Sequence, residues 1–500
     1  MQNTTGELAR LRPKQLAGVH WMVNAFKVHR ALGLFDDPGL GKTLQALTLI
    51  SLMGWKRILI VAPAGARRVW FAQILAWFPE WRDRIVIIEP GHFPTVRDLQ
   101  REDVIVLVAY DTLSAKDSPW ARHLAAQSWD FLGVDESHYL KNPSQRTKAV
   151  YGRRGSNEGI QASAERVLLM TGTPTPNHIG ELWQHMRALW PHTLCSLATG
   201  DRPMTEGEFL ERVCTYKDSK FGRQVTGSTE AGRKLVRDRL GPYVRRVSKA
   251  EALPELPPVI EQDVPLAPSP DQVTDALPFE VRAMERDLYR ADDDALWRAM
   301  HRVPRDDDDE RHPLSTLRRA LGEQKISGTV EWVAERLACG ASKILVFGWH
   351  VRALERLHRL LAEYEPVLIT GRTRPIERVP LVDRFQKRPS CRVFVGQIQA
   401  AGTAITLTAA SEVVIFEPSW VPGDNRQCID RAHRMGQRDH VLAHYLYLPG
   451  TLDQRILQVM RRKAAHTQGV FRGEVHDDDR AGQHHPRFNH CAVEFEGQAS

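Results

Sequence analysis

The chain of 500 residues carries a formal net charge of +7 and has a sequence pI near 9.1. Its length allows about two to four domains with their own cores, and its basic balance favours an anionic partner, nucleic acid first. No apolar run approaches the ~18 residues of a membrane span, and the opening MQNTTGELARLRPKQ lacks the apolar stretch of a signal peptide. The six cysteines form no C-x-x-C pair. We therefore expect a soluble cytoplasmic protein (nuclear in a eukaryote) without disulfides, structural zinc or a membrane partner.

The sequence DDPGLGKTLQALTLI, which begins at Asp36, is the first stretch that indicates chemistry. Gly39 and Gly41 leave room for backbone N–H groups to approach phosphate oxygens. Lys42 supplies a cation for terminal phosphates, the Thr43 hydroxyl can hold magnesium, and the following helix offers an anion-binding N-terminus. The usual pattern G-x-x-x-x-G-K-[ST] has glycine where this chain has Asp36, and a glycine turn with a solvated lysine is the alternative. The stretch predicts a nucleoside triphosphate site.

Two sets of short apolar runs follow in chain order. The first set is RILIVAP (57–63), DVIVLVAY (103–110), FLGVDES (131–137) and RVLLMTGT (166–173). The second set is KILVFGW (343–349), PVLITG (366–371), CRVFVGQ (391–397) and EVVIFEP (412–418). Apolar runs without alternation indicate strands that are buried on both faces, hence parallel sheets covered by helices. Two such sets predict two α/β lobes.

The region between the two sets has a different composition. Residues 195–250 are polar with few strand signals, and residues 252–270 are proline-rich, which favours extended backbone. Residues 271–335 look helical around the acidic run RDDDDER, which is most simply a solvated loop. We therefore expect helices in residues 271–335, and the whole region shows no clear hairpin signal.

The tail of the chain is rich in Gly, Asp and His, and we expect it to be disordered. Its HHPRFNHC (484–491) matches no standard zinc spacing. The expected units are an N-terminal nucleotide-binding lobe (1–194), a helical insertion with a proline-rich linker (195–265), a second helical insertion (266–335), a C-terminal lobe (336–465) and the tail (466–500).

Acidic and hydroxyl residues end two strands of the first set. Asp135 and Glu136 follow FLGV, at the edge of the sheet where α/β proteins bind ligands. Asp135 could hold magnesium and Glu136 could orient and deprotonate an attacking water, the two roles that phosphoryl transfer needs; a surface turn is the alternative. Thr171 and Thr173 end the next strand. Their hydroxyls suit a link from this site to the rest of the protein, besides forming a proline turn that caps a helix.

The sequence RQCIDRAHRMGQ places Gln427, Arg431 and Arg434 at i, i+4 and i+7 of a helix. Arginines aimed across a cleft could meet phosphates bound by the other lobe, as arginine fingers do. Taken alone, such a stripe is more often a solvated helix face.

An ordered series of stretches resembles the motifs of superfamily-two helicases, specifically the Swi/Snf-type DNA translocases. The series runs LRPKQLAGVHWM (Q motif), DDPGLGKT (I), VAPAGARRVW (Ia), VAYDTL (Ib), DESH (II), TGTPTPN (III), KILVFGWHVRALERL with ITGRTRPIERVPLVDRF (IV), AAGTAITLTAA (V) and QCIDRAHRMGQ (VI). YVRRVSKAEALPELPPVIEQ (243–262) also resembles the family's segment between its lobes. Each motif is modest alone, but the order of the whole series is highly specific.

This resemblance implies two tandem RecA-like P-loop lobes, ATP and Mg²⁺ as cofactors, and double-stranded DNA, held through its backbone, as the partner; an unknown protein partner stays open. It implies catalytic roles for Lys42, Asp135, Glu136, Arg431 and Arg434, nucleotide contacts by Gln15, Pro38, Gly39, Leu40, Gly41, Lys42, Thr43 and Gln427, and magnesium contacts by Thr43 and Asp135. An acid is ordinary at Asp36 in this family, and Gln15 would read the adenine.

Three places depart from the family's pattern. Pro38 stands where methionine is usual, Thr175 and Pro176 where Ile-Gln is common, and Ala404 and Thr406 where Gly and Asn are common. These departures resemble the HepA-related annealing-helicase branch.

The expected function is an ATPase that moves along duplex DNA without separating its strands. A strand-separating DNA or RNA helicase and a nucleic-acid-binding scaffold without ATP turnover are the alternatives. All of the implied catalytic residues are present, which argues against the scaffold.

Overall fold

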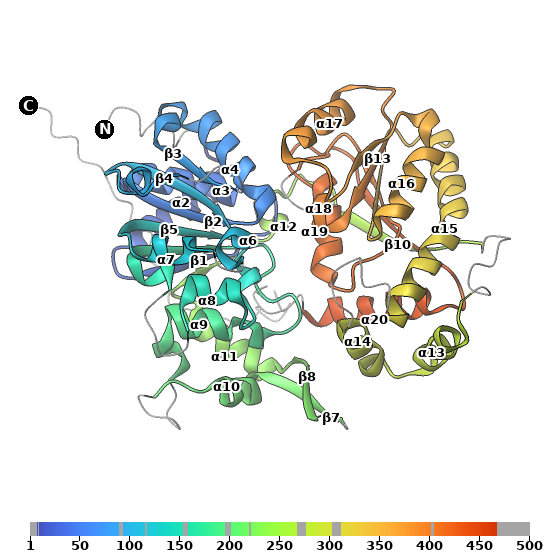
Figure 1. The fold of residues 1–500 in the computed structure, drawn as a ribbon, viewed down its shortest axis with the longest axis horizontal. Coiled ribbons are helices and arrows are strands. Elements are labelled where there is room, and N and C mark those ends of the chain that lie inside the picture. Colours follow the sequence, from blue (N-terminus) through green and yellow to red (C-terminus); the bar gives the residue numbers. More distant parts are fainter. Residues whose placement is uncertain are drawn as a thin grey trace, which may run out of the picture.

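The computed structural model describes residues 8, 10–89, 94–115, 118–153, 159–195, 202–219, 222–267, 277–302, 312–401 and 405–467. It contains two α/β lobes that lie side by side, the N-terminal lobe at the left of Figure 1 and the C-terminal lobe at the right. The predicted fold class, two tandem RecA-like lobes, is confirmed. Nearly all of the tail, including HHPRFNHC, lies outside the described residues. Among the described residues, no helix is both long and apolar enough to cross a membrane.

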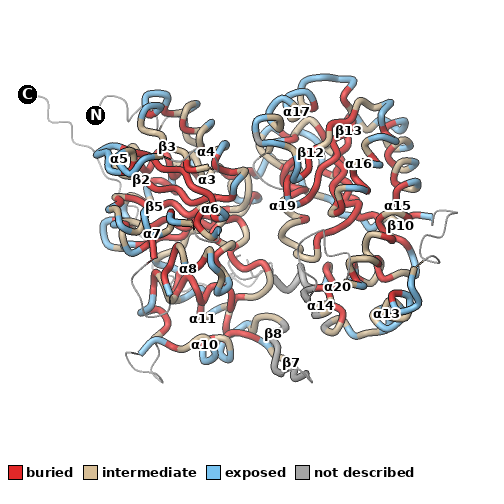
Figure 2. Tube along the Cα trace, viewed as in Figure 1, coloured by how far each residue is buried: buried red, intermediate tan, exposed pale blue. Residues whose placement is uncertain are grey.

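The first lobe is built on a seven-stranded parallel sheet in the order β3-β4-β2-β5-β6-β1-β9. Its strands are β1 (Ala31–Leu34), β2 (Arg57–Ala62), β3 (Ile85–Ile88), β4 (Val104–Ala109), β5 (Trp129–Asp135), β6 (Ala164–Met170) and β9 (Val244–Arg245). The four predicted runs of the first set became β2, β4, β5 and β6. The central strands are buried along their length because helices cover both faces of the sheet (Figure 2).

Two groups of helices sandwich this sheet. They are α2 (Pro13–Ala25), α3 (Lys42–Met53), α4 (Ala64–Trp77), α5 (Val96–Leu99), α6 (Tyr110–Ser114), α7 (Trp120–Ala125), α8 (Gln145–Tyr151) and α9 (Trp183–Leu189). Apolar residues of α2, α3 and α4 pack on one face of the sheet, as with Met22, Leu47 and Trp70. Residues of α8 and α9, such as Val150 and Met186, pack on the other face. The helices cover the two faces of the sheet, and the polar loops follow the carboxyl ends of β1, β5 and β6.

The insertion after the first lobe contains a β-hairpin that the sequence did not predict. It consists of α10 (Glu206–Val213), β7 (Cys214–Ser219), β8 (Gly222–Ser228) and α11 (Glu230–Leu240). β7 and β8 pair antiparallel, with Tyr216 opposite Val225 and a register shift next to Thr215. The hairpin projects from the lower end of the first lobe in Figure 1, and β8 lies against α20 (Leu452–Thr467) of the second lobe. The expectation of a purely helical insertion was therefore wrong.

The linker that joins the lobes, of which only the later part is proline-rich, supplies one edge strand to each lobe. β9 pairs with β1 in the first sheet. The short helix α12 (Lys249–Ala252) follows, and β10 (Val259–Pro265) then pairs with β15 in the second sheet. The linker is thus extended, as predicted, but it is part of both sheets rather than a free connection.

The second lobe has a six-stranded parallel sheet in the order β10-β15-β14-β11-β13-β12. The strands are β11 (Ile344–Gly348), β12 (Val367–Ile369), β13 (Val393–Gln397), β14 (Glu412–Ile415) and β15 (Val441–Tyr447), with β10 as given above. The helices are α13 (Phe279–Arg290), α14 (Asp293–Arg302), α15 (Pro313–Ala338), α16 (Val351–Leu360), α17 (Pro375–Lys387), α18 (Ile398–Ala401), α19 (Pro422–Ala432) and α20 (Leu452–Thr467). The second predicted set of strands is confirmed, and the described part of 271–335 is helical. The acidic run RDDDDER lies outside the described residues.

Candidate active site at the lobe interface

The phosphate-type loop connects β1 to α3 in the first lobe. Gly39 and Gly41 have φ values of 86° and 77°, the left-handed region that favours glycine. A Cβ atom built on Gly41 would lie 2.4 Å from Nε2 of Gln15, so a larger residue there would also have to displace the Gln15 side chain. Lys42 begins α3, and its Nζ donates hydrogen bonds to the carbonyl oxygens of Asp36 (2.6 Å) and Asp37 (3.2 Å). The loop therefore curls around a lysine ammonium group at a helix N-terminus, as the sequence predicted.

Asp36 anchors this loop to the linker. Its side chain is only 2% exposed and accepts hydrogen bonds from Arg245 Nη1 (2.9 and 2.7 Å), the Val247 backbone N–H (2.9 Å) and Gln45 Nε2 (3.1 Å). Asp37 accepts from Arg246 Nη2 and from the backbone N–H of Lys249. A glycine at position 36 could make none of these side-chain contacts. The acid in place of glycine thus holds the β1–α3 loop against the segment that leads to the second lobe.

The acid pair lies at the end of β5, beside the loop. Asp135 accepts hydrogen bonds from Trp70 Nε1 (2.9 Å) and from the Glu136 backbone N–H (3.0 Å). Burial and the adjacent charge of Glu136 raise the pKa of Asp135. Burial acts on the pKa of Glu136 in the same direction, but the hydrogen bond with His138 and the charges of His138, Lys42 and Arg431 outweigh it and lower that pKa. The two neighbouring carboxyl groups therefore differ in pKa, and Glu136 is the one that favours the ionised form.

Glu136 also has an unusual backbone conformation. Its φ of 48° lies in the left-handed region that side chains rarely adopt. Such residues concentrate at functional sites, where the surrounding contacts fix them. Here the contacts are His138, with Nδ1 3.4 Å from Glu136 Oε2, and the Thr171 hydroxyl, also at 3.4 Å.

His138 joins the acid pair to the end of β6. Its Nδ1 lies 3.0 Å from Thr171 Oγ1 and 3.5 Å from Thr173 Oγ1, and the Thr173 backbone N–H donates to Thr171 Oγ1 (3.1 Å). A Cβ atom built on Gly172 would lie 2.5 Å from Cγ of Pro38, so the same turn also packs against the phosphate-type loop. The hydroxyl groups predicted to link this site outward do contact it, and they do so through a histidine that the sequence did not single out.

Gln15 lies beside the phosphate-type loop. Its Oε1 accepts the Arg12 backbone N–H (3.0 Å), and its Nε2 donates to the carbonyl of Leu40 (3.1 Å). Together with Leu253 and Met435 these residues surround a small hollow between the loop, the linker and the second lobe.

The two arginines of α19 and the turn after it reach this site from the second lobe. Arg431 Nε donates to the carbonyl of Gln427 (3.0 Å), and Arg434 Nε donates to that of Asp430 (2.9 Å). A Cβ atom built on Gly39 would lie 3.3 Å from Cγ of Arg434, which places Arg434 over the phosphate-type loop. Burial, and secondly the charge of Arg431, lower the pKa of Arg434 to about 9. Two cations are thus crowded together opposite the acid pair.

Gln427 lies one turn before Arg431 and faces a different space. It lines a cleft of about 1010 Å³ between the lobes, together with Thr173 and Gly423. The cleft walls also include residues of motifs Ia and Ib (63–65, 110–111), Lys141 and Arg146 from the first lobe, and Arg318 and Arg378 from the second. Of the implied nucleotide-binding residues, Gln427 is the one that the structure places on this cleft rather than at the loop.

The donor set fits a nucleoside triphosphate with Mg²⁺. Glycines with no room for a side chain, a lysine at a helix N-terminus and a raised pKa at Asp135 all favour added phosphate and metal charges at this edge. Thr43 lies beside Lys42 in the first turn of α3. Beyond the predicted residues, the structure adds Trp70, which donates to Asp135, and His138. The sequence Asp-Glu-Ser-His could have indicated that His138 lies near the acid pair. Nothing near Trp70 in the sequence indicated that it contacts Asp135.

Two parallel-sheet lobes, with a phosphate-type loop on one and paired arginines facing it from the other, define the helicase class of P-loop proteins. The chain belongs to the SNF2-related family: the SNF2-related domain matches residues 14–274, and the Helicase conserved C-terminal domain matches residues 331–436. The predicted family is thereby confirmed.

Individual relatives are similar over most of this chain. The DNA annealing helicase and endonuclease ZRANB3 of Homo sapiens is 29% identical over 93% of this chain and 41% of its own length. The SWI/SNF-related matrix-associated actin-dependent regulator of chromatin subfamily A-like protein 1 of Xenopus tropicalis is 28% identical over 91% and 44%. This chain therefore spans about two fifths of the curated relatives it matches. The Sulfolobus solfataricus SWI2/SNF2 ATPase core in complex with dsDNA aligns at a TM-score of 0.42 and 25% identity, covering 92% of this chain and 94% of that one.

Proposed function

We propose that this protein hydrolyses ATP to ADP and phosphate with Mg²⁺ and uses the energy to move on double-stranded DNA. The observation that carries the proposal is the meeting of the two lobes at one site, where Arg434 lies over Gly39 and the charge of Arg431 acts on Glu136. A hydrolytic site divided between two lobes is what couples turnover to lobe movement.

Each residue has a distinct role in this proposal. Lys42 and the N–H groups of the glycine loop hold the terminal phosphates, and Thr43 and Asp135 hold the metal. Bound Mg²⁺ supplies charge neutralisation between phosphate oxygens. Glu136, kept ionised and oriented by His138 and Thr171, positions the attacking water and accepts its proton. Arg431 and Arg434 stabilise the charge that develops on the transferred group.

The large cleft suits a nucleic-acid backbone. Arg378 donates to the carbonyl oxygens of Thr373 and Ala400, which holds its guanidinium at the cleft wall without a carboxylate among those contacts. The chain's net charge of +7 has the matching sign. Contacts of this kind read phosphate rather than base edges, so we propose that binding is nearly independent of sequence.

The test is an ATPase assay of wild-type protein with duplex, single-stranded and forked DNA and with RNA. Stimulation by duplex DNA, absent in Lys42→Ala protein that still binds DNA, is the expected result. A rate that no nucleic acid changes, or turnover that survives Lys42→Ala, would overturn the proposal. We further propose that residues 1–194 and 336–465 form the motor lobes, with β9 and β10 added by the linker, and that the protein works in the cytoplasm or, in a eukaryote, in the nucleus.

Strand separation is a second candidate function, and the β7–β8 hairpin favours it. Enzymes that unwind duplexes usually need a projecting element that divides the strands, and this hairpin projects from the first lobe and lies against α20. A third strand on a long duplex reports translocation, and a labelled strand of a partial duplex reports separation.

A shortened hairpin distinguishes the two functions. Replacing residues 217–224 with Asn-Gly joins the paired Tyr216 and Val225 through a two-residue turn. If the protein translocates on duplex DNA, the third strand is displaced with ATP and the partial duplex stays paired. The shortened variant then gives the same two results as the wild type. Release of the labelled strand by wild type but not by the shortened variant would instead establish a hairpin-dependent helicase.

A further inference from the structure

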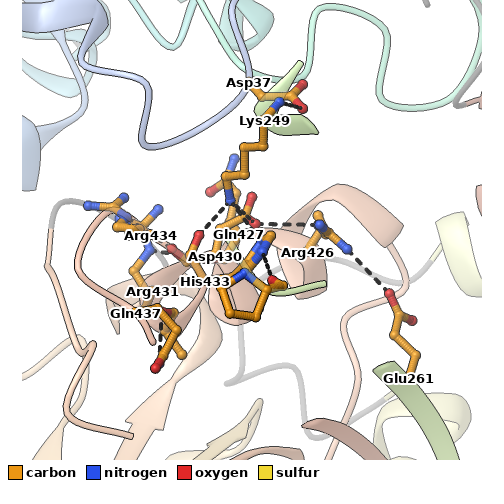
Figure 3. A network of polar contacts seen from close by, with 12 residues as sticks. Asp37, Lys249, Glu261, Arg426, Gln427, Asp430, Arg431, His433, Arg434 and Gln437 are labelled. Atoms are coloured by element: carbon orange, nitrogen blue, oxygen red, sulfur yellow. Dashed lines mark hydrogen bonds and ion pairs between the residues drawn. The ribbon is translucent and has the colours of Figure 1, made fainter. Parts of the chain in front are cut away.

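A buried lysine from the linker lies against the helix that carries the paired arginines. Lys249 is 6% exposed, and its Nζ donates to Asp430 Oδ1 (2.5 Å) and to the carbonyl of His433 (2.7 Å). Figure 3 shows the Lys249 side chain descending onto the end of α19, with Arg426 on one side of its contact with Asp430 and Arg431 and Arg434 on the other. His433 is fixed in turn by Nε2 at 2.9 Å from the carbonyl of Pro257. The linker therefore grips this helix end at two points.

The same lysine is tied to the phosphate-type loop through its backbone. The Lys249 N–H donates to Asp37 Oδ2 (3.1 Å), and Arg246 Nη2 donates to Asp37 Oδ1 (3.0 Å). One residue of the linker thus contacts the loop of the first lobe with its backbone and the arginine helix of the second lobe with its side chain. A shift of the loop would therefore move the Lys249 side chain relative to α19, because Lys249 spans the distance between them.

Asp430 is an unfavourable neighbour for two catalytic arginines. It is 1% exposed, precedes Arg431 directly and lies one turn before Arg434. A buried carboxylate without a partner would form an ion pair with whichever guanidinium could reach it. Arg426 Nε approaches Asp430 Oδ1 at 3.4 Å from the turn before, but among the described contacts Asp430 Oδ2 accepts no hydrogen bond. Lys249 supplies the closest cation to this carboxylate.

We propose that Lys249 is a positioning residue, which rests on the proposed function: it holds the Asp430 carboxylate and leaves Arg431 and Arg434 free to face the phosphates. In its absence Asp430 draws one of these guanidinium groups back toward α19. The loss falls on turnover rather than on ATP binding, because the phosphate-type loop and the Gln15 pocket are unchanged. Because the backbone N–H of Lys249 is bonded to Asp37, the hold of Lys249 on Asp430 depends on the conformation of the phosphate-type loop.

The experiment compares Lys249→Met, Asp430→Asn and the double variant in the full chain, with duplex DNA at saturation. Lys249→Met should lower kcat by about tenfold or more at unchanged KM, since a misplacement on the order of 1 Å can cost that much. Asp430→Asn should keep a kcat near that of the wild type, although it lowers stability because it leaves Lys249 buried without a carboxylate. The double variant should regain most of the kcat, because an amide cannot form an ion pair with an arginine. Equal losses in both single variants, without recovery in the double variant, would overturn the positioning role.

A second readout separates positioning from structural support. Lys325, 1% exposed, makes a similar buried ion pair with Asp453 (3.0 Å) inside the second lobe, without a contact to Asp430 among the described hydrogen bonds and ion pairs. Lys325→Met is the matched control. It should lower the unfolding temperature, while the kcat of the folded variant stays near the wild-type kcat. If Lys249→Met lowers stability as the control does, with no split between kcat and KM, Lys249 is only a structural tie. Absent turnover in the wild type would instead contradict the proposed function itself.

Discussion

Asp36 offers the sharpest test of how the first lobe is held to its linker. Asp36→Asn keeps the shape of the side chain but removes the charge that faces Arg245, whose side chain is 13% exposed. Breaking one partner of a buried ion pair costs about 3–5 kcal/mol, and since asparagine keeps one acceptor we expect about 3 kcal/mol. Urea unfolding should show this loss, and hydrogen exchange should locate it in β1, α3 and β9.

Two companion variants make the test decisive. Glu323→Gln breaks a pair with Arg356 whose side chains are 33% and 55% exposed, so its effect should stay within about 0.5 kcal/mol. Arg245→Met should couple to Asp36→Asn, the double variant losing clearly less than the sum of the two. Additive losses, or an Asp36→Asn effect as small as that of Glu323→Gln, would refute the idea that this acid anchors the loop.

Three further predictions follow from the site. Glu136→Gln should bind ATP with near-normal affinity and lose hydrolysis, whereas Lys42→Ala should lose both while DNA binding survives; near-normal turnover by Glu136→Gln would reject its role. Arg431→Ala and Arg434→Ala should lower kcat on the order of a thousandfold with DNA bound and change ATP affinity little, as equilibrium binding and steady-state rates can show. His185, hydrogen-bonded to Tyr151, has its pKa lowered by burial to about 3. The contribution of neutral His185 to the free energy of unfolding is fully present above pH ~6.5, the pKa of an unfolded histidine, and about 2 kcal/mol of it is lost by pH 5. Urea unfolding at both pH values should show a smaller loss of stability for His185→Gln than for the wild type.

The sequence predicted those parts of the site that lie within single motifs. Lys42 follows β1 through the glycine loop, Asp135 ends β5 and Glu136 comes directly after it, and each position can be read from a local pattern. What it could not predict depends on distant partners. The reason for an acid at Asp36 is Arg245, 209 residues away, and Lys249 reads as a surface lysine until Asp430, 181 residues away, is placed against it.

The missed strands have the same explanation. β9 has two residues and β10 reads as part of a proline-rich linker, so both become strands only by pairing with β1 and β15. The β7–β8 sequence, CTYKDS and GRQVTGS, shows no apolar alternation and no Asn-Gly or Asp-Gly turn, the two signals that identify a hairpin. Backbone pairing formed it without those signals.

The linker's two strands constrain how the lobes can move in the proposed cycle. β9 belongs to the first sheet and β10 to the second, so residues 246–258 lie outside both sheets. The last six of them, 253–258, lead from α12 into β10. That segment reads LPELPP, and each proline fixes its own φ near −65° and restricts the residue before it. A joint so short and stiff favours rotation of one lobe against the other over free separation. Lys249 begins α12, the helix that leads into this joint, and the joint itself contacts the same helix end through the Pro257 carbonyl and His433. A rotation of the second lobe would therefore strain the contacts of Lys249 with Asp430 and His433 together with that of Pro257. In the proposed cycle these contacts couple the phosphate-type loop to the joint, so that closing on ATP would move the second lobe along DNA.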